Sequence, residues 1–241
     1  LMRAVVTDGA RHLAPHGVLQ VLGNWAHVAG QPWDERLAGW IAGTGCDALV
    51  IQREVLDPYE YIEIWLADAG LAGTAGYASA YEGWLDYFDH LGVTGIGMGW
   101  VTLVNAGRDV PDVRVEEWTH AVEQPVGPAL AAQLGSVDAA RWSDDQVLDH
   151  SWRLTSDVVQ ETLGAPGAED PSHIVLRQQR GLRRAVEVDT ALGGTLGACD
   201  GDLTLREILG AVAQLLGVPL SDLVADVLPR FRRLVAEAWF D

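Results

Sequence analysis

The spacing of hydrophobic residues along the first 106 positions predicts alternating helices and strands. Short, nearly continuous apolar runs at residues 18–25 and 47–55 predict strands that are buried on both faces, and a longer run at 93–105 predicts a third strand. Apolar residues that recur every three or four positions predict a helix ending near residue 12, and helices at 32–42, 57–69 and 75–91. This order indicates an α/β layer with at least some parallel strand pairing.

The rest of the chain predicts a second set of elements. A short strand is predicted at 113–118, helices at 128–142 and 143–152, strands at 157–163, 173–180 and 184–188, and three helices at 189–199, 203–216 and 220–239. Ser143 suits an N-cap, and Thr204 can form a capping box with Glu207. The stretch 164–171 is rich in proline, glycine and acidic residues, which is typical of a loop.

Two of the last three helices carry apolar stripes that we expect to pack together as a core. The predicted stripe of the helix at 203–216 consists of Leu205, Ile208, Leu209, Val212, Leu215 and Leu216. That of the last helix consists of Leu223, Val227, Leu228, Phe231, Leu234 and Val235.

The charge of the chain argues against broad binding to nucleic acid. Its 34 acidic residues outnumber 16 basic residues, all of them arginine, and the net charge is −18. Such a chain repels phosphate backbones. Residues 171–241 are nearly neutral, with a net charge of −1, and place Arg230, Arg232 and Arg233 near the carboxyl end of a helix, where the helix dipole favours cations. A protein or peptide partner is therefore expected there rather than nucleic acid.

The cysteines, the histidines and the hydropathy pattern bear on the cellular location of the protein and on whether it binds a metal or a membrane. Cys46 and Cys199 lie too far apart in sequence to indicate a disulfide framework or a zinc site, so a cytoplasmic protein is expected, with Cys46 as a buried thiol. The seven histidines show no metal-ligand spacing. The sequence contains no apolar run of the roughly 18–20 residues that span a bilayer, so no membrane association is expected.

The glycine-rich segment Gly95-Ile96-Gly97-Met98-Gly99 resembles a nucleotide-binding loop only superficially. A loop of that kind follows a strand and opens a helix, so that phosphate groups meet the helix amides. Here the glycines lie inside a predicted strand, which continues through Trp100. Alternation places the three glycines on one face, where a helix or a ligand is expected to approach the strand closely.

The ends of the first two strands carry the candidate substrate-binding residues. Open α/β sheets bind ligands at the carboxyl ends of their strands. There the chain places polar and aromatic groups that can hold a flat substrate with hydrogen-bonding atoms, namely Asn24, Trp25, His27, Arg53, Glu54 and Tyr59. Alternatively, Asn24 satisfies loop amides, and Arg53 and Glu54 form a surface pair. No arrangement of serine, histidine and aspartate indicates a nucleophilic catalyst.

Four segments give the first part of the chain a family resemblance: GNW at 23–25, HVAGQPWDERLAGW at 27–40, QREVLDPYEYIEIWL at 52–66 and GVTGIGMGWVTL at 92–103. They resemble the carboxyl-terminal portion of an actinobacterial class I S-adenosylmethionine-dependent methyltransferase family that is similar to the release-factor glutamine methyltransferases. The resemblance implies the second half of a Rossmann-like sheet, with residues 18–25, 47–55 and 93–105 as its fifth, sixth and seventh strands. It also implies that the parent enzyme transfers methyl from S-adenosylmethionine to nitrogen.

The motifs that would bind the cofactor do not occur in this sequence. It contains no glycine-rich loop between a strand and a helix, and no Asn-Pro dipeptide from which an Asn-Pro-Pro-Tyr motif could be built. The resemblance therefore implies a portion of a methyltransferase that lacks the cofactor-binding half and binds no cofactor alone. The missing amino-terminal half is its expected partner, and the strand at 18–25 is expected at an exposed sheet edge, through which a homodimer can also form.

The last part of the chain carries a second resemblance. The segment LGACDGDLTLREI at 196–208 resembles the helix–turn–helix entry of a PqqD-like winged-helix domain. We therefore expect a methyltransferase carboxyl-terminal half at residues 1–106, a connecting region at 107–142 and an α+β winged-helix-like domain at 143–241. The alternative function is a non-enzymatic module that binds a protein or peptide partner.

Overall fold

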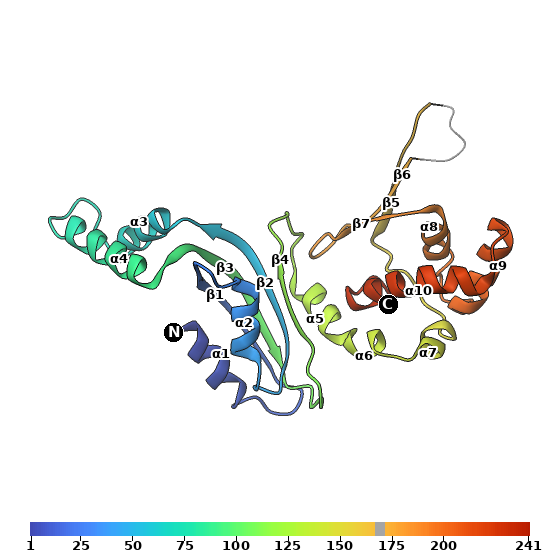
Figure 1. Ribbon diagram of the computed structural model, residues 1–241, viewed down its shortest axis with the longest axis horizontal. Coiled ribbons are helices and arrows are strands. Elements are labelled where there is room, and N and C mark those ends of the chain that lie inside the picture. Colours follow the sequence, from blue (N-terminus) through green and yellow to red (C-terminus); the bar gives the residue numbers. More distant parts are fainter. Residues whose placement is uncertain (167–171) are drawn as a thin grey trace. The chain divides into compact units, whose positions relative to one another are not determined.

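The computed structural model describes residues 1–166 and 172–241 (Figure 1). It is a mixed α and β structure that divides into two compact units, unit 1 from Leu1 to His120 and unit 2 from Ala121 to Asp241. This division assigns the predicted connecting region, 107–142, partly to each unit. The predicted loop at 164–171 lies mostly outside the described residues.

Unit 1 is built on a four-stranded mixed sheet. Its strands are β1 (Val18–Val28), β2 (Asp47–Leu56), β3 (Val93–Val104) and β4 (Val113–Glu117), in the order β1-β3-β2-β4. β3 runs antiparallel to both β1 and β2, whereas β4 pairs with β2 in parallel. Some parallel pairing was predicted, and it is confined to the β2–β4 pair among the described strands.

β1 lies at one edge of this sheet and is more exposed than its apolar sequence predicts. The expectation that it is buried on both faces is wrong, since Leu22 is 71% exposed and Val18 is also exposed. β2 does match that expectation, because its first six residues are all buried. The difference arises because β2 has strands on both sides, whereas β1 pairs with β3 alone among the described strands.

Helices cover the two faces of the sheet at different places. α1 (Met2–Ala10) and α2 (Trp33–Ile41) pack on one face, in a cluster with Val50, Val101 and Leu103. α3 (Pro58–Asp68) and α4 (Tyr77–Leu91) form a hairpin whose core includes Ile96, on the opposite face of β3. This hairpin lies at the end of the strands (Figure 1). α3 begins at Asp57, whose carboxylate accepts the backbone N–H of Glu60 at 2.8 Å.

The glycines of β3 make room for neighbouring strands rather than for a helix. A Cβ atom at Gly97 would lie 2.0 Å from Gln52 Oε1 and 2.4 Å from Trp25 Nε1, and one at Gly99 would lie 2.0 Å from the Ile51 carbonyl oxygen. The expected close approach is therefore present, but it is made by side chains and backbone of β1 and β2. The bare face is already filled by protein atoms.

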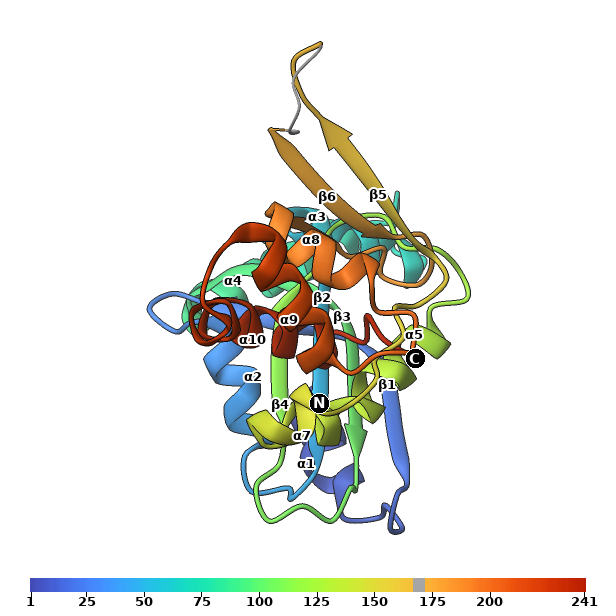
Figure 2. The ribbon, with the colours of Figure 1, turned by 90° about the vertical axis from the view of Figure 1, so that its right-hand side faces the viewer.

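Unit 2 combines helices with a separate antiparallel sheet. The helices are α5 (Gly127–Gly135), α6 (Val137–Ala140), α7 (Asp144–Leu148), α8 (Thr190–Gly197), α9 (Leu205–Leu216) and α10 (Leu220–Ala236). The sheet has the order β5-β6-β7, from β5 (Val158–Leu163), β6 (His173–Gln178) and β7 (Ala185–Val188). The β5–β6 hairpin projects beyond the helices (Figure 2).

The turns predicted in unit 2 are confirmed by their hydrogen bonds. Thr204 and Glu207 form the capping box of α9, and Ser143 forms one with Gln146 at α7. Gly201, in the turn before α9, has a positive φ of 89°, which glycine adopts without strain.

The core of unit 2 follows most, but not all, of the predicted apolar stripes. The six predicted positions of α10 are all buried. In α9, Leu205, Ile208 and Leu209 are buried, whereas Leu215 is 87% exposed and Leu216 is also exposed. The prediction is wrong for these two leucines because α9 ends at Gly217, and its last turn lies outside the buried cluster.

The three arginines of α10 are each paired with a carboxylate. Arg230 contacts Asp189 at 2.6 Å, Arg232 contacts Asp144 at 2.7 Å and Arg233 contacts Glu237 at 2.9 Å. Their charges are therefore partly neutralised within unit 2.

The Asp189 carboxylate links the stability of unit 2 to pH. Burial opposes its ionisation, but hydrogen bonds from the Leu192 N–H and from Arg230 outweigh burial and lower its pKa. A lowered pKa stabilises the fold above the pKa of the unfolded chain, about 4, and this contribution is lost as the pH falls through the folded value. We expect Asp189→Asn, which keeps a capping side chain, to lower the free energy of unfolding at pH 7 by less than about 1 kcal/mol, since Asp189 is half exposed. In urea titrations at several pH values, the difference should vanish in acid; a difference that persists at low pH would contradict the assignment.

Two further observations concern the buried thiols and the helices. Cys46 and Cys199 are both buried and free, and burial raises the pKa of Cys199 to about 12, so its thiol stays protonated at neutral pH. None of the helices in the described ranges is both long enough and apolar enough to cross a membrane.

Candidate functional site

A cavity of about 400 Å³ lies beside the carboxyl-terminal half of β1, in unit 1. Strand β1 contributes Asn24, Trp25 and Ala26 to its lining, and the end of β3 near α4 contributes Val93 and Ile96. The α3–α4 hairpin supplies Tyr61, Trp84, Tyr87, Phe88 and Leu91, while α2 supplies Arg36 and Trp40. The first residues of the chain, Leu1, Met2 and Arg3, complete the wall.

An aromatic cluster forms the wall on the side of the hairpin. The Tyr61 ring lies 6.1 Å from both the Trp84 and the Phe88 rings, and Trp84 meets Phe88 edge to face at 5.5 Å. Rings in these arrangements attract one another beyond their apolar burial, which holds the wall in a fixed shape. The cavity therefore presents π-faces and ring edges to a bound molecule.

Asn24 and Tyr61 supply polar groups beside this aromatic wall. Burial raises the pKa of the Tyr61 hydroxyl, although hydrogen bonds with Trp65 and Asn24 act in the opposite direction. The phenol therefore stays protonated at neutral pH and can donate one hydrogen bond. Asn24 adds an amide with both donor and acceptor atoms, so the pair can recognise a planar group that carries an N–H or a carbonyl.

Behind the cavity, Trp25, Gln52 and His27 form a network across β3. Gln52 Oε1 accepts the indole N–H of Trp25 at 2.9 Å and lies 2.7 Å from His27 Nε2. Because an amide oxygen only accepts, His27 must carry its proton on Nε2. Trp33 stacks on the Trp25 and His27 rings at 6.2 and 5.7 Å. Trp25 is only 2% exposed, so this is a buried link between β1 and β2 over β3.

Arg36 connects α2 to the outer edge of β1. Its guanidinium donates a hydrogen bond to the Ala26 carbonyl and lies 5.4 Å from the Trp40 ring. The Ala26 carbonyl thus has a partner, while the cation remains beside the cavity that Arg36 lines.

The structure brings only part of the predicted site together. Asn24 and Trp25 line the cavity, and His27 belongs to the network behind it. Arg53 instead lies over the Trp100 ring at 5.4 Å and donates to the Trp118 carbonyl, while burial lowers its pKa. Glu54 and Tyr59 are exposed, and neither lines the cavity. Arg53 and Glu54 therefore do not form the surface pair considered as the alternative.

The aromatic wall and Arg36 are missing from the predicted site. Tyr61 on α3, and Trp84 and Phe88 four residues apart on α4, belong to apolar stripes that indicate helix core, and they do pack in a core cluster. The spacing does not reveal that residues of the hairpin and of β1 line one cavity. Two adjacent helices with several aromatic residues, directly after a strand end, were the available signal.

Comparisons with known proteins add no family assignment. The chain matches no family model and no curated protein.

Proposed function

We propose that unit 1 is the carboxyl-terminal half of an S-adenosylmethionine-dependent methyltransferase sheet that acts on nitrogen, and that the cavity beside β1 binds the methyl acceptor. The observation that carries the proposal is the edge position of β1. Under the resemblance drawn from the sequence, β1, β2 and β3 correspond to the fifth, sixth and seventh strands. The missing strands of a Rossmann-like sheet would then pair with the outer edge of β1, which has no strand partner among the described residues.

The backbone of β1 offers this edge over a limited length. The His27 carbonyl accepts a hydrogen bond from Thr94 of β3, so its groups face β3. By alternation, the backbone groups of Leu22, Asn24 and Ala26 face outwards. Arg36 already occupies the Ala26 carbonyl. A pairing strand would therefore run along Val18–Asn24 and end at Ala26, directly beside the cavity.

The position of the cavity fits an acceptor site. It lies toward the carboxyl end of β1, where open α/β sheets bind their ligands. The aromatic wall can stack on a planar acceptor, and Asn24 with the Tyr61 hydroxyl can fix the direction of its nitrogen lone pair. These residues bind and orient the acceptor, whereas the methyl group comes from the cofactor.

The described residues do not themselves fit the cofactor. The glycine-rich segment 95–99 lies inside β3, where the space above Gly97 and Gly99 is filled by Gln52, Trp25 and the Ile51 carbonyl. The glycines at 70, 73 and 76 follow a helix, α3, and not a strand. A cofactor loop needs a strand, a turn and a helix amino terminus in succession. We therefore assign the binding of S-adenosylmethionine to the missing amino-terminal half of the proposed sheet.

Calorimetric titration of the chain with S-adenosylmethionine tests this assignment. We expect no measurable binding to the chain alone, and micromolar or tighter binding would overturn it. The coding sequence upstream of Leu1 should encode a glycine-rich loop and an Asn-Pro-Pro-Tyr motif. An upstream sequence without either would contradict the methyltransferase proposal.

The role of Asn24 is tested once both halves are present. Co-expressed halves should transfer labelled methyl from S-adenosylmethionine to an acceptor, and Asn24→Ala should lower kcat/KM by about 10- to 100-fold, the loss expected for one well-oriented polar contact. Tyr59→Phe, at an exposed position outside the cavity, is the matched control and should leave kcat/KM unchanged. Equal effects of the two substitutions would remove Asn24 from the acceptor site.

A further inference from the structure

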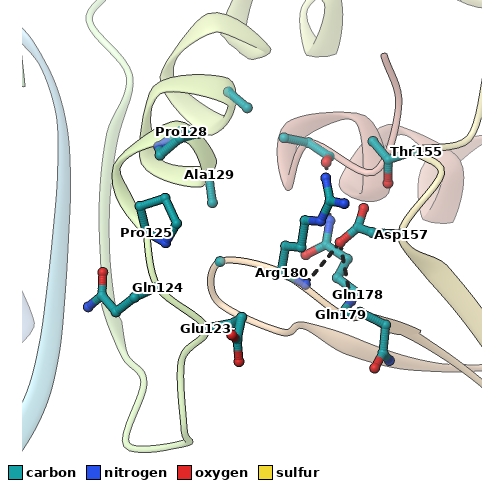
Figure 3. Close-up of a pocket in the computed structure, with 13 residues that line it drawn as sticks. Glu123, Gln124, Pro125, Pro128, Ala129, Thr155, Asp157, Gln178, Gln179 and Arg180 are labelled. Atoms are coloured by element: carbon teal, nitrogen blue, oxygen red, sulfur yellow. Dashed lines mark hydrogen bonds between the residues drawn. The ribbon is translucent and has the colours of Figure 1, made fainter.

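Unit 2 contains a second cavity, of about 600 Å³, which the proposed methyltransferase role does not use (Figure 3). One wall is apolar and comes from α5 and the segment before it, with Pro125, Pro128, Ala129 and Ala132. The opposite wall is polar and comes from the start of the β5–β6 hairpin and the β6–β7 turn, with Thr155, Asp157, Gln178, Gln179 and Arg180. A volume of this size holds a drug-sized molecule or two to three peptide residues.

The two walls are held at a fixed separation. The Glu123 N–H donates to the Gly181 carbonyl at 2.8 Å, which ties the segment before α5 to the β6–β7 turn. Gly181 packs so closely that a Cβ atom there would lie 2.2 Å from the Ala129 Cβ atom. The cavity is therefore built into the fold of unit 2, and its shape does not depend on long, mobile side chains.

Two of the polar groups are already engaged in holding the turn. Asp157 Oδ2 accepts the backbone N–H groups of Gln179 and Arg180 at 3.2 and 3.0 Å. Gln178 Nε2 donates to the Ala238 carbonyl at 3.1 Å. These interactions explain Asp157 and Gln178 as structural residues.

Thr155 and Arg180 differ in their access to the cavity. Thr155 Oγ1 makes no hydrogen bond to the residues that the structure describes, but it is enclosed by protein atoms, so a molecule in the cavity does not reach it. The guanidinium of Arg180 forms no ion pair or hydrogen bond within the described ranges, and its side chain rises between the α5 wall and the Thr155–Asp157 segment (Figure 3). The Arg180 side chain is exposed, and an unpaired arginine in a concave site is suited to an acidic group.

We propose that this cavity binds a carboxylate carried on a short apolar body. Arg180 can hold the carboxylate through two parallel hydrogen bonds. The proline and alanine wall accommodates the apolar part. Glu123 and Asp157 at the same cavity, together with the net charge of −18, disfavour a doubly charged phosphate and favour a group with a single negative charge.

Such a carboxylate can come from the carboxyl terminus of a peptide or from a small organic acid. Three probes separate these sources in calorimetric and NMR titrations of the full chain: N-acetyl-Ala-Leu with a free carboxylate, its carboxamide, and hexanoate. The free acid should bind at least about tenfold more tightly than the carboxamide, because the amide loses the charge-assisted pair. Hexanoate binding as tightly as the dipeptide acid supports the proposal with a small acid as ligand, and weaker hexanoate binding supports it with a peptide terminus.

Substitutions locate the binding. Arg180→Gln should weaken binding of the free acid by at least about tenfold, because it removes the charge-assisted pair. Arg233→Gln removes the same charge from an exposed site on α10, outside the cavity, and should leave the affinity unchanged. Equal affinity for acid and carboxamide, absence of binding at millimolar concentrations, or binding that survives Arg180→Gln would each overturn the proposal.

Discussion

Replacing Gly97 by alanine should lower the free energy of unfolding by about 2–4 kcal/mol, because the new methyl group overfills a packed site and breaks a buried hydrogen bond. The added Cβ atom would lie 2.0 Å from Gln52 Oε1 and 2.4 Å from Trp25 Nε1. These two atoms form the 2.9 Å hydrogen bond that joins β1 and β2 across β3. Neither side chain can move aside easily, since Trp25 is 2% exposed and Gln52 is 1% exposed.

Urea denaturation of two glycine variants checks this expectation. Gly83→Ala is the matched control, because Gly83 lies within α4 and a Cβ atom there would contact nothing within 4 Å. That variant should raise the free energy of unfolding by about 0.5–1 kcal/mol, the usual gain of alanine over glycine in a helix. If Gly97→Ala were as stable as the wild type, the close approach of Gln52 and Trp25 to β3 would be disproved.

A double variant separates the clash from a general effect of alanine in a strand. Gln52→Ala removes the amide that the new methyl group would meet. We expect the costs of Gln52→Ala and Gly97→Ala to be less than additive, because the second change no longer overfills the same space. Simple additivity would show that Gly97 and Gln52 act independently.

The hydrophobic periods predict where the elements lie but not what surrounds them. Each described strand and helix lies at or near a predicted element, except that the single helix predicted at 128–142 is two helices, α5 and α6. The same type of apolar run forms the buried strand β2 and the exposed edge strand β1. Whether a strand has neighbours on both sides depends on pairing between distant segments, which the local period does not record. The resemblance to half a methyltransferase sheet did lead us to expect an edge at residues 18–25.

The candidate site is predicted in part, for a similar reason. The strand-end rule locates Asn24 and Trp25 beside the cavity. It does not place Arg53 and Glu54, because the pairing of β2 with β3 shifts between Gln52 and Glu54. Such an irregularity changes the direction of the side chains that follow it, and no residue pattern in the segment predicts it. Tyr61 and Trp84 reach the cavity only because α3 and α4 pack as a hairpin.

Phe231 and Leu215 give the sharpest test of the core of unit 2, since the sequence predicts both as buried. Phe231 is 0% exposed, and its ring lies 5.7 Å from Trp152 and 4.6 Å from Phe240. Phe231→Ala should therefore lower the free energy of unfolding by about 3–5 kcal/mol, through lost apolar burial and the cavity that remains.

Leu215→Ala removes a leucine from an 87% exposed position on α9. Its free energy of unfolding should stay within about 0.5 kcal/mol of the wild type, because little apolar surface is buried there and both residues favour helices. Urea denaturation followed by tryptophan fluorescence measures both variants, with Trp152 as a reporter beside Phe231. A large loss for Leu215→Ala would mean that the end of α9 is covered by a partner, and a small loss for Phe231→Ala would place the core of unit 2 elsewhere.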